Sequence, residues 1–206
     1  MNRILKNLSL ALLLAGAPVL VMVQTAPSQA QAADPAVAQI QGFYDALTDS
    51  MKSGGTTKSR YEKLKPAVEK AFDLAAMTQV AIGPSWATAS DADKKALVDA
   101  FTRMTIANYA KSFDSYSGEK FIVEPASIVR GSDHFVKSTM KTSSDTIAFN
   151  YRLHQAGSDR KITDVLLAGN ISQMAQKRSD FAATLAASGP QGLAKRMNAL
   201  TDQMLG

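Results

Sequence analysis

One stretch, TIAFNYRLHQAGSDRKITDV at 146–165, restricts the fold more than any other part of the chain. In its first half, large apolar side chains alternate with smaller or polar ones; they are Ile147, Phe149, Tyr151 and Leu153. A period of two places them on one face of a β-strand. The turn-forming residues 156–159 follow, and a second apolar segment begins at Ile162. The sequence therefore predicts a hairpin whose apolar face has to be covered.

The remainder of the chain predicts helices before and after a run of strands. Apolar residues recur with helical spacing in 34–51, 58–72, 90–116, 171–185 and 190–205, and a short segment, 77–82, ends at Gly83-Pro84. After Ser117-Gly118 the period changes, and 120–130, 134–142, 146–155 and 161–167 are predicted strands. This order predicts an α+β fold, with a twisted antiparallel sheet of about four strands covered by helices that enclose an apolar pocket.

Helix ends are marked by typical capping residues. Asp34-Pro35 supplies an N-cap and a first-turn proline, and Ser90 is followed by the acidic residues Asp91 and Asp93. Pro66 lies in the middle of the predicted helix 58–72, which leaves either a kinked pair of helices or a broken start. The 90–116 segment gives the strongest helix prediction because its apolar stripe is broad.

The N-terminus has the pattern of a secretory signal peptide. Arg3 and Lys6 precede an apolar run over 8–23, and Ala30-Gln31-Ala32 has the small-x-small form of a cleavage site. Pro18 and the polar, Ala-rich stretch after the run favour cleavage over a transmembrane anchor. We expect residues 1–32 to be removed near Ala32, leaving a single periplasmic domain over 33–206.

Composition excludes several classes of function. The 206-residue chain is 46% hydrophobic and 20% charged, as in globular proteins, and it contains no cysteine, which rules out disulfides, thiol catalysis and a lipid anchor on cysteine. Removing residues 1–32 takes away two basic residues and lowers the formal charge from +5 to +3. Such a small charge does not call for nucleic acid, and it permits an anionic membrane surface.

Motifs for catalysis, metals or cofactors are missing from the sequence. The two histidines, His134 and His154, are out of phase with the apolar strand face, so we expect exposed or edge imidazoles. Residues 83–87 resemble a nucleophile elbow but lack its final glycine, and no phosphate-binding glycine loop occurs. Asp164 and Arg178 are charges within apolar segments; they either hold the sheet to the following helix or contact a ligand headgroup.

Two long stretches resemble the MlaC family of periplasmic lipid carriers, also called the toluene-tolerance auxiliary family. They are SWATASDADKKALVDAFTRMTIANYAKSFDSYSGEKF and KITDVLLAGNISQMAQKRSDFAATLAASGPQGL. The positions that fit the family pattern are Trp86, Phe101, Tyr109, Tyr116, Lys161-Ile162, Asp164-Val165, Gly169, Ser172, Arg178, Phe181, Gly189 and Leu193. Arg160 departs from it, because the family commonly has an aromatic residue there. YSGEKF and ISQMAQKRSDF are most similar to the hopanoid-associated branch, HpnM.

The resemblance implies an NTF2-like fold that holds apolar chains between sheet and helices, with the headgroup at the mouth. It also implies exchange of a phospholipid or hopanoid with MCE-type and ABC-transporter membrane complexes and an outer-membrane acceptor complex. The flexible side chains of Met77, Met104 and Met140 suit a pocket for variable lipid tails, although each is equally consistent with core filling.

The leading hypothesis is a non-covalent lipid carrier that needs no cofactor and no metal. We expect the pocket wall to contain Tyr44, Leu47, Phe101, Met104, Tyr109, Ile147, Phe149 and Tyr151. One rival is a small enzyme of the same fold, which requires an acid or base inside the pocket. The other rival is a periplasmic adaptor without cargo, which predicts no cavity and no bound lipid.

Overall fold

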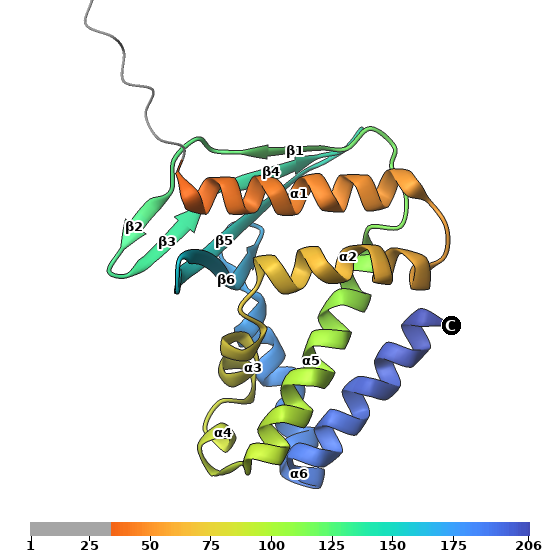
Figure 1. Ribbon diagram of the computed structural model, residues 1–206, viewed down its shortest axis with the longest axis vertical. Helices are drawn as coiled ribbons and strands as arrows, with labels where there is room; N and C mark the ends of the chain where they lie inside the picture. Colours follow the sequence, from red (N-terminus) through yellow and green to blue (C-terminus); the bar gives the residue numbers. More distant parts are fainter. Residues whose placement is uncertain (1–33) are drawn as a thin grey trace, which may run out of the picture. The chain divides into compact units, whose positions relative to one another are not determined.

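The computed structural model describes residues 34–206, and the expected signal peptide, 1–32, lies outside this range. Within residues 34–206 the helices are α1 (Pro35–Ser53), α2 (Thr57–Ala71), α3 (Leu74–Ile82), α4 (Ser85–Thr88), α5 (Asp91–Ser112) and α6 (Gln173–Leu205). The strands are β1 (Lys120–Val123), β2 (Ile128–Arg130), β3 (Asp133–Val136), β4 (Ser138–Lys141), β5 (Thr146–Ala156), β6 (Asp159–Leu167) and β7 (Ile171–Ser172). The predicted α+β order is confirmed (Figure 1).

The predicted helix starts are confirmed at the level of individual hydrogen bonds. The Asp34 carboxylate accepts from the Ala36 N–H, Pro35 is the first residue of α1, and the Ser90 hydroxyl accepts from the Asp93 N–H. The second helix is neither broken nor paired, because α2 continues through Pro66. Leu64 and Val68, on either side of that proline, are fully buried, so packing holds the helix together where a backbone hydrogen bond is lost.

Within residues 34–206 the sheet has seven strands, and the prediction of about four was wrong. Each of the first two predicted strands is divided in two, at 124–127 and at Lys137, and these breaks face each other, since the Glu124 N–H donates to the Lys137 carbonyl at 2.9 Å. The hairpin therefore bends at one place in both strands, which residue alternation does not reveal. A short additional strand, β7, pairs with the end of β6.

The long strand β5 organises the sheet. On one side its first half pairs with β4 and its second half with β3, and on the other side it pairs with β6 from Phe149 to its end. The two Gly-Ser-Asp sequences form the tight turns before β3 and β6. Gly131 and Gly157 have φ angles of 61° and 62°, a left-handed conformation that favours glycine in a hairpin turn.

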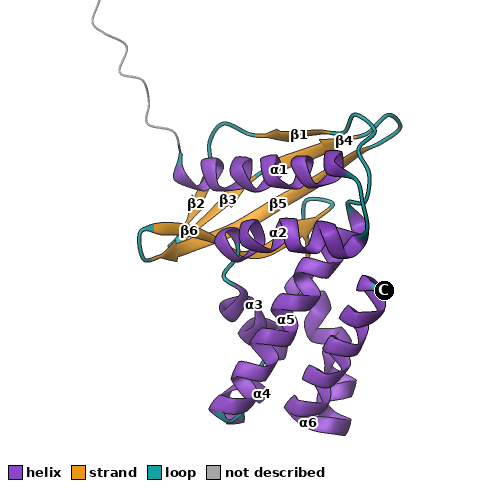
Figure 2. Ribbon diagram, turned by 45° about the vertical axis from the view of Figure 1, so that its right-hand side comes forward, coloured by secondary structure: helices purple, strands orange, loops and turns teal. Residues whose placement is uncertain are grey.

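The helices divide into two groups around the sheet. Helices α1 and α2 lie across it, whereas α3, α5 and α6 extend away from it and pack on one another (Figures 1 and 2). Gly189, with a φ of 61°, kinks α6 and separates the two helices that the sequence predicts there. Within residues 34–206, no helix combines the length and the apolarity needed to cross a membrane.

Asp164 and Arg178 have the structural role that the sequence offered as one alternative. The Asp164 carboxylate accepts from the Ser172 hydroxyl and the Met174 N–H, so it joins β6 to the start of α6. The Arg178 guanidinium donates through two nitrogens to the Val80 carbonyl, at 2.9 and 2.7 Å. Each charge therefore ties α6 to a neighbouring element, and the two do not pair with each other.

Candidate functional site

A cavity of about 310 Å³ lies between the sheet and helices α5 and α6. Its walls are mostly aromatic and aliphatic, contributed by α1, α3, α5, α6, β1, β5 and β6. Six of the eight residues expected from the sequence line it: Tyr44, Phe101, Met104, Tyr109, Phe149 and Tyr151. The cavity is at the small end of the range for ligand sites, roughly 300–1,000 Å³.

The other two expected residues are not among those that line the cavity. Leu47 of α1 is fully buried in the core cluster. Ile147 is half-buried opposite Met140, and the pairing of β5 with β6 begins only at Phe149, so Ile147 lies past the end of the neighbouring strand. The period-two pattern placed Ile147 on the correct face, but it could not show where the next strand ends.

Three tyrosines line the cavity wall; Tyr44 and Tyr151 are buried, and Tyr109 is half-buried. Tyr44 stacks on Phe121 with a ring-centre distance of 4.4 Å and meets the edge of Tyr151 at 5.8 Å. Removal from water raises the pKa of the Tyr44, Tyr109 and Tyr151 hydroxyls, and the hydrogen bond with Ser138 only partly offsets this for Tyr44. These side chains are therefore neutral at ordinary pH and give the wall a few fixed hydroxyl groups.

Polar residues line the cavity from two helices that pack on each other. Thr105, Asn108 and Ser112 recur at three and four along α5, while Gln173 and Lys177 are one turn apart at the start of α6. Of the described residues that line the cavity, only Lys177 is charged. These five residues are called the polar rim below.

The sequence did not predict the polar rim or part of the cavity wall. Phe72, Phe121, Met174 and Lys177 line the cavity but were not predicted. One signal was available on α5, since Asn108 and Ser112 interrupt an otherwise apolar stripe, which is unusual for a face that only fills a core. The others come from separate elements, and no periodicity connects them.

A second hollow, an open groove of about 610 Å³, lies beside α2, the start of α3, the middle of α5 and the turn between β5 and β6. Phe72 borders both the groove and the cavity and is almost fully buried. The groove has three cationic and three acidic side chains: Lys65, Arg103, Lys161, Glu69, Asp73 and Asp99. Although it is larger, this balanced charge and its polar lining make it a poor match for an apolar ligand.

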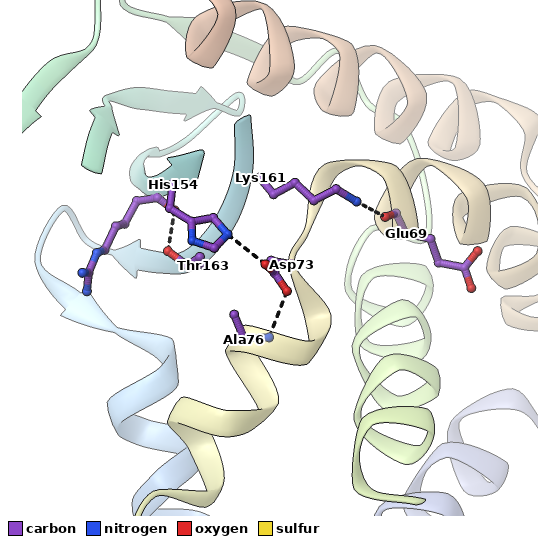
Figure 3. A network of polar contacts seen from close by, with 7 residues as sticks. Glu69, Asp73, Ala76, His154, Lys161 and Thr163 are labelled. Carbon is purple, nitrogen blue, oxygen red and sulfur yellow. Dashed lines mark hydrogen bonds and ion pairs between the residues drawn. The ribbon is translucent and has the colours of Figure 1, made fainter. Parts of the chain in front are cut away.

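Polar contacts at the groove fix the start of α3 against the sheet (Figure 3). The His154 Nε2–H donates to the Asp73 carboxylate at 2.8 Å, and the same carboxylate accepts from the Ala76 N–H at 2.9 Å. Lys161 donates to the Glu69 carbonyl at 3.1 Å. His134 contacts the Ser127 hydroxyl, so both histidines are half-buried and hydrogen-bonded, where the sequence predicted exposed or edge imidazoles.

The family was identified by comparison with known proteins. Residues 39–199 match the family model described as MlaC protein. The chain belongs to the MlaC family. MlaC proteins are non-enzymatic lipid carriers, which confirms the expectation that this chain is no enzyme. In the part of the chain that the structure describes, no group of three or more acidic or histidine side chains is placed to hold a metal ion.

A solved structure shares the MlaC fold of this chain. It is described as the phospholipid-binding protein from Ralstonia solanacearum in complex with a phospholipid. The two are 19% identical, the match covers 84% of this chain and 100% of the other, and the TM-score is 0.73. At this identity the likeness shows a common fold. No curated protein matches this MlaC chain.

Proposed function

We propose that this MlaC protein is a soluble periplasmic carrier that shields the apolar part of a phospholipid or hopanoid and moves it between membrane complexes without a covalent step. The apolar cavity between sheet and helices carries the proposal. Burial contributes roughly 0.8 kcal/mol per methylene, so a chain segment of about ten methylenes is held by on the order of 8 kcal/mol.

The wall residues suit this role. Tyr44, Phe101, Met104, Tyr109, Phe149 and Tyr151 are proposed to contact the lipid, as expected from the sequence. A cavity of about 310 Å³ accepts a two-chain lipid only if its walls separate. Three flexible methionines in the wall, Met77, Met104 and Met174, can repack as this happens. Met140, also suggested from the sequence, is not among the lining residues.

Location and partners are part of the same proposal. Residues 1–32 act as a cleaved export signal, and 33–206 form the single carrier domain. The partners are MCE-type and ABC-transporter complexes of the inner membrane and an acceptor complex of the outer membrane. The support is membership of a typically periplasmic family, together with the bound phospholipid of the Ralstonia protein. Resemblance to HpnM supports a hopanoid cargo.

Mass spectrometry tests the carrier proposal directly. Residues 33–206 are purified from a periplasm, measured under native conditions, and then extracted with solvent so that any bound lipid is identified. We expect a stoichiometric phospholipid or hopanoid adduct. A clean mass of the free protein that persists after incubation with both lipid types would instead support the adaptor, which the cavity already disfavours.

A pair of substitutions shows whether the cavity is the place of binding. Phe149→Glu puts a charge into the apolar wall, whereas Val129→Glu makes the same kind of change at a side chain that is 59% exposed. We expect only Phe149→Glu to abolish the lipid adduct. A folded Phe149→Glu protein that retains its lipid would show that the lipid binds elsewhere.

A further inference from the structure

We propose that the polar rim is a phosphate-recognition site in which Lys177 makes the carrier select lipids with an anionic headgroup over neutral lipids with the same chains. This inference rests on the proposed carrier function and narrows the cargo that it leaves open. The chemistry recognised is a phosphate group. Its source is the lipid headgroup, and free phosphate is tested separately.

The first argument is the distribution of charge around the cavity. The other lining residues described by the structure are uncharged, and no acidic side chain is among them to oppose Lys177. A single cation in an otherwise uncharged wall attracts an anion, because nearby apolar walls weaken the screening by water.

The second argument is that the rim gives a phosphate more than one donor. Gln173 lies one helical turn before Lys177, and Asn108 and Ser112 line the same cavity from α5. Amide, hydroxyl and ammonium groups all donate hydrogen bonds, and a phosphate accepts several at once. Apolar pockets commonly fix a ligand's orientation with a few such convergent groups.

The third argument is that Lys177 remains available. Its nearest carboxylate is Asp180, at 3.6 Å on the next turn of α6, and 44% of the Asp180 side chain is exposed. Exposed pairs at this spacing are weak, so a phosphate can displace the contact. The N-terminus of α6 already binds a carboxylate, since Asp164 accepts from the Met174 N–H. A phosphate in the cavity is therefore left to Lys177.

An uncharged polycyclic lipid gains little from such a site. Its apolar body is accommodated by the same aromatic wall, but it offers no anion to Lys177. The rim therefore favours the phospholipid among the two cargo classes of the carrier proposal.

The test uses two soluble probes with identical chains, dioctanoyl phosphatidic acid and dioctanoylglycerol, titrated into delipidated protein. We expect wild type to bind the phosphatidic acid about tenfold more tightly, and we expect Lys177→Gln to lose most of this preference because its affinity for the phosphatidic acid falls. Lys177→Arg should keep the preference, because arginine also binds phosphate. Lys195→Gln, an exposed lysine on α6 outside the cavity lining, is the matched control.

Two further arms separate the possible explanations. Asp180→Asn removes the competing carboxylate and should increase the preference, and inorganic phosphate at the lipid concentration should not compete. Equal preference in wild type and Lys177→Gln would overturn the inference while leaving the carrier intact. Strong competition by inorganic phosphate would overturn the lipid headgroup as the ligand. A wild type that binds neither lipid would overturn the carrier proposal itself.

Discussion

Tyr44 of α1 and Ser138 of β4 are joined by a hydrogen bond of 2.7 Å between their hydroxyl oxygens, 94 positions apart in the chain. Ser138 also contacts the Phe149 carbonyl, which can only accept, so Ser138 donates to that carbonyl and Tyr44 donates to Ser138. This chain of bonds fixes Tyr44 in the cavity wall and connects α1 with two strands.

Removing this hydrogen bond should destabilise the protein modestly, and the effects of removing its two partners should not be additive. Tyr44→Phe keeps the ring and loses the donor, and Ser138→Ala loses the partner, so we expect each to lower the free energy of unfolding by about 1 kcal/mol. Urea denaturation of the two single variants and the double variant measures their coupling. Because the residues share one bond, the double variant should lose less than the sum, and full additivity would contradict the assigned bond.

Arg60 should be among the most sensitive polar positions. It is 5% exposed, and its guanidinium donates to the Ala110 carbonyl at 2.9 Å and the Gly55 carbonyl at 2.7 Å, so it joins α2 to the end of α5. We expect Arg60→Met to lower the free energy of unfolding by about 2–4 kcal/mol, because hydrogen bonds from charged donors are lost and carbonyls are left unpaired.

Lys58→Met serves as the control for Arg60, since Lys58 is exposed on the same helix. Thermal or urea unfolding of this variant should remain within about 0.5 kcal/mol of wild type. If both substitutions lowered the free energy of unfolding equally, the buried hydrogen bonds of Arg60 would not stabilise the fold.

The three tyrosines of the cavity wall predict loss of stability in alkali. Burial raises the pKa of Tyr44, Tyr109 and Tyr151 in the folded state above the ordinary value of 10.0. A raised folded pKa leaves stability intact below pH 10 and removes it as the pH rises through the window between the unfolded and folded values. Each group then contributes up to about 1.4 kcal/mol per pH unit.

Urea midpoints between pH 8 and 11, with tyrosinate absorbance at 295 nm, check this prediction. Unfolding and tyrosine ionisation should occur together, and Tyr109→Phe should make the decline in stability less steep. A decline of unchanged slope in Tyr109→Phe would mean that other groups cause the alkaline transition.

The contact between Asp73 and His154 should stabilise the start of α3 through two separable effects. Asp73→Ala removes both the helix cap and the acceptor for His154, so we expect a loss of about 1–2 kcal/mol. Asp73→Asn retains a capping oxygen and should lose less. Amide exchange in α3 reports the difference, and identical exchange in the two variants would argue against a capping role.

The local structure was readable from the sequence for physical reasons. Capping at Asp34 and Ser90, the glycine turns at 131 and 157 and the kink at Gly189 depend on the chemistry of a few adjacent residues. The alternation in β5, the α5 stripe and the helical spacing in α1 also led to six of the residues that line the cavity. Periodicity identifies which residues share a face, and such a face has to be buried or filled.

Tertiary structure alone decided the bend in the hairpin, the limits of the cavity and its polar rim. Ile147 and Phe149 are on the same face of β5. Only Phe149 lies in the part of β5 that pairs with β6, and only Phe149 lines the cavity. Phe72, Phe121 and Lys177 reach the cavity from three elements far apart in the chain. Local sequence patterns do not determine which distant side chains line one cavity. That depends on strand ends, helix crossings and helix kinks, which are set when the whole domain packs.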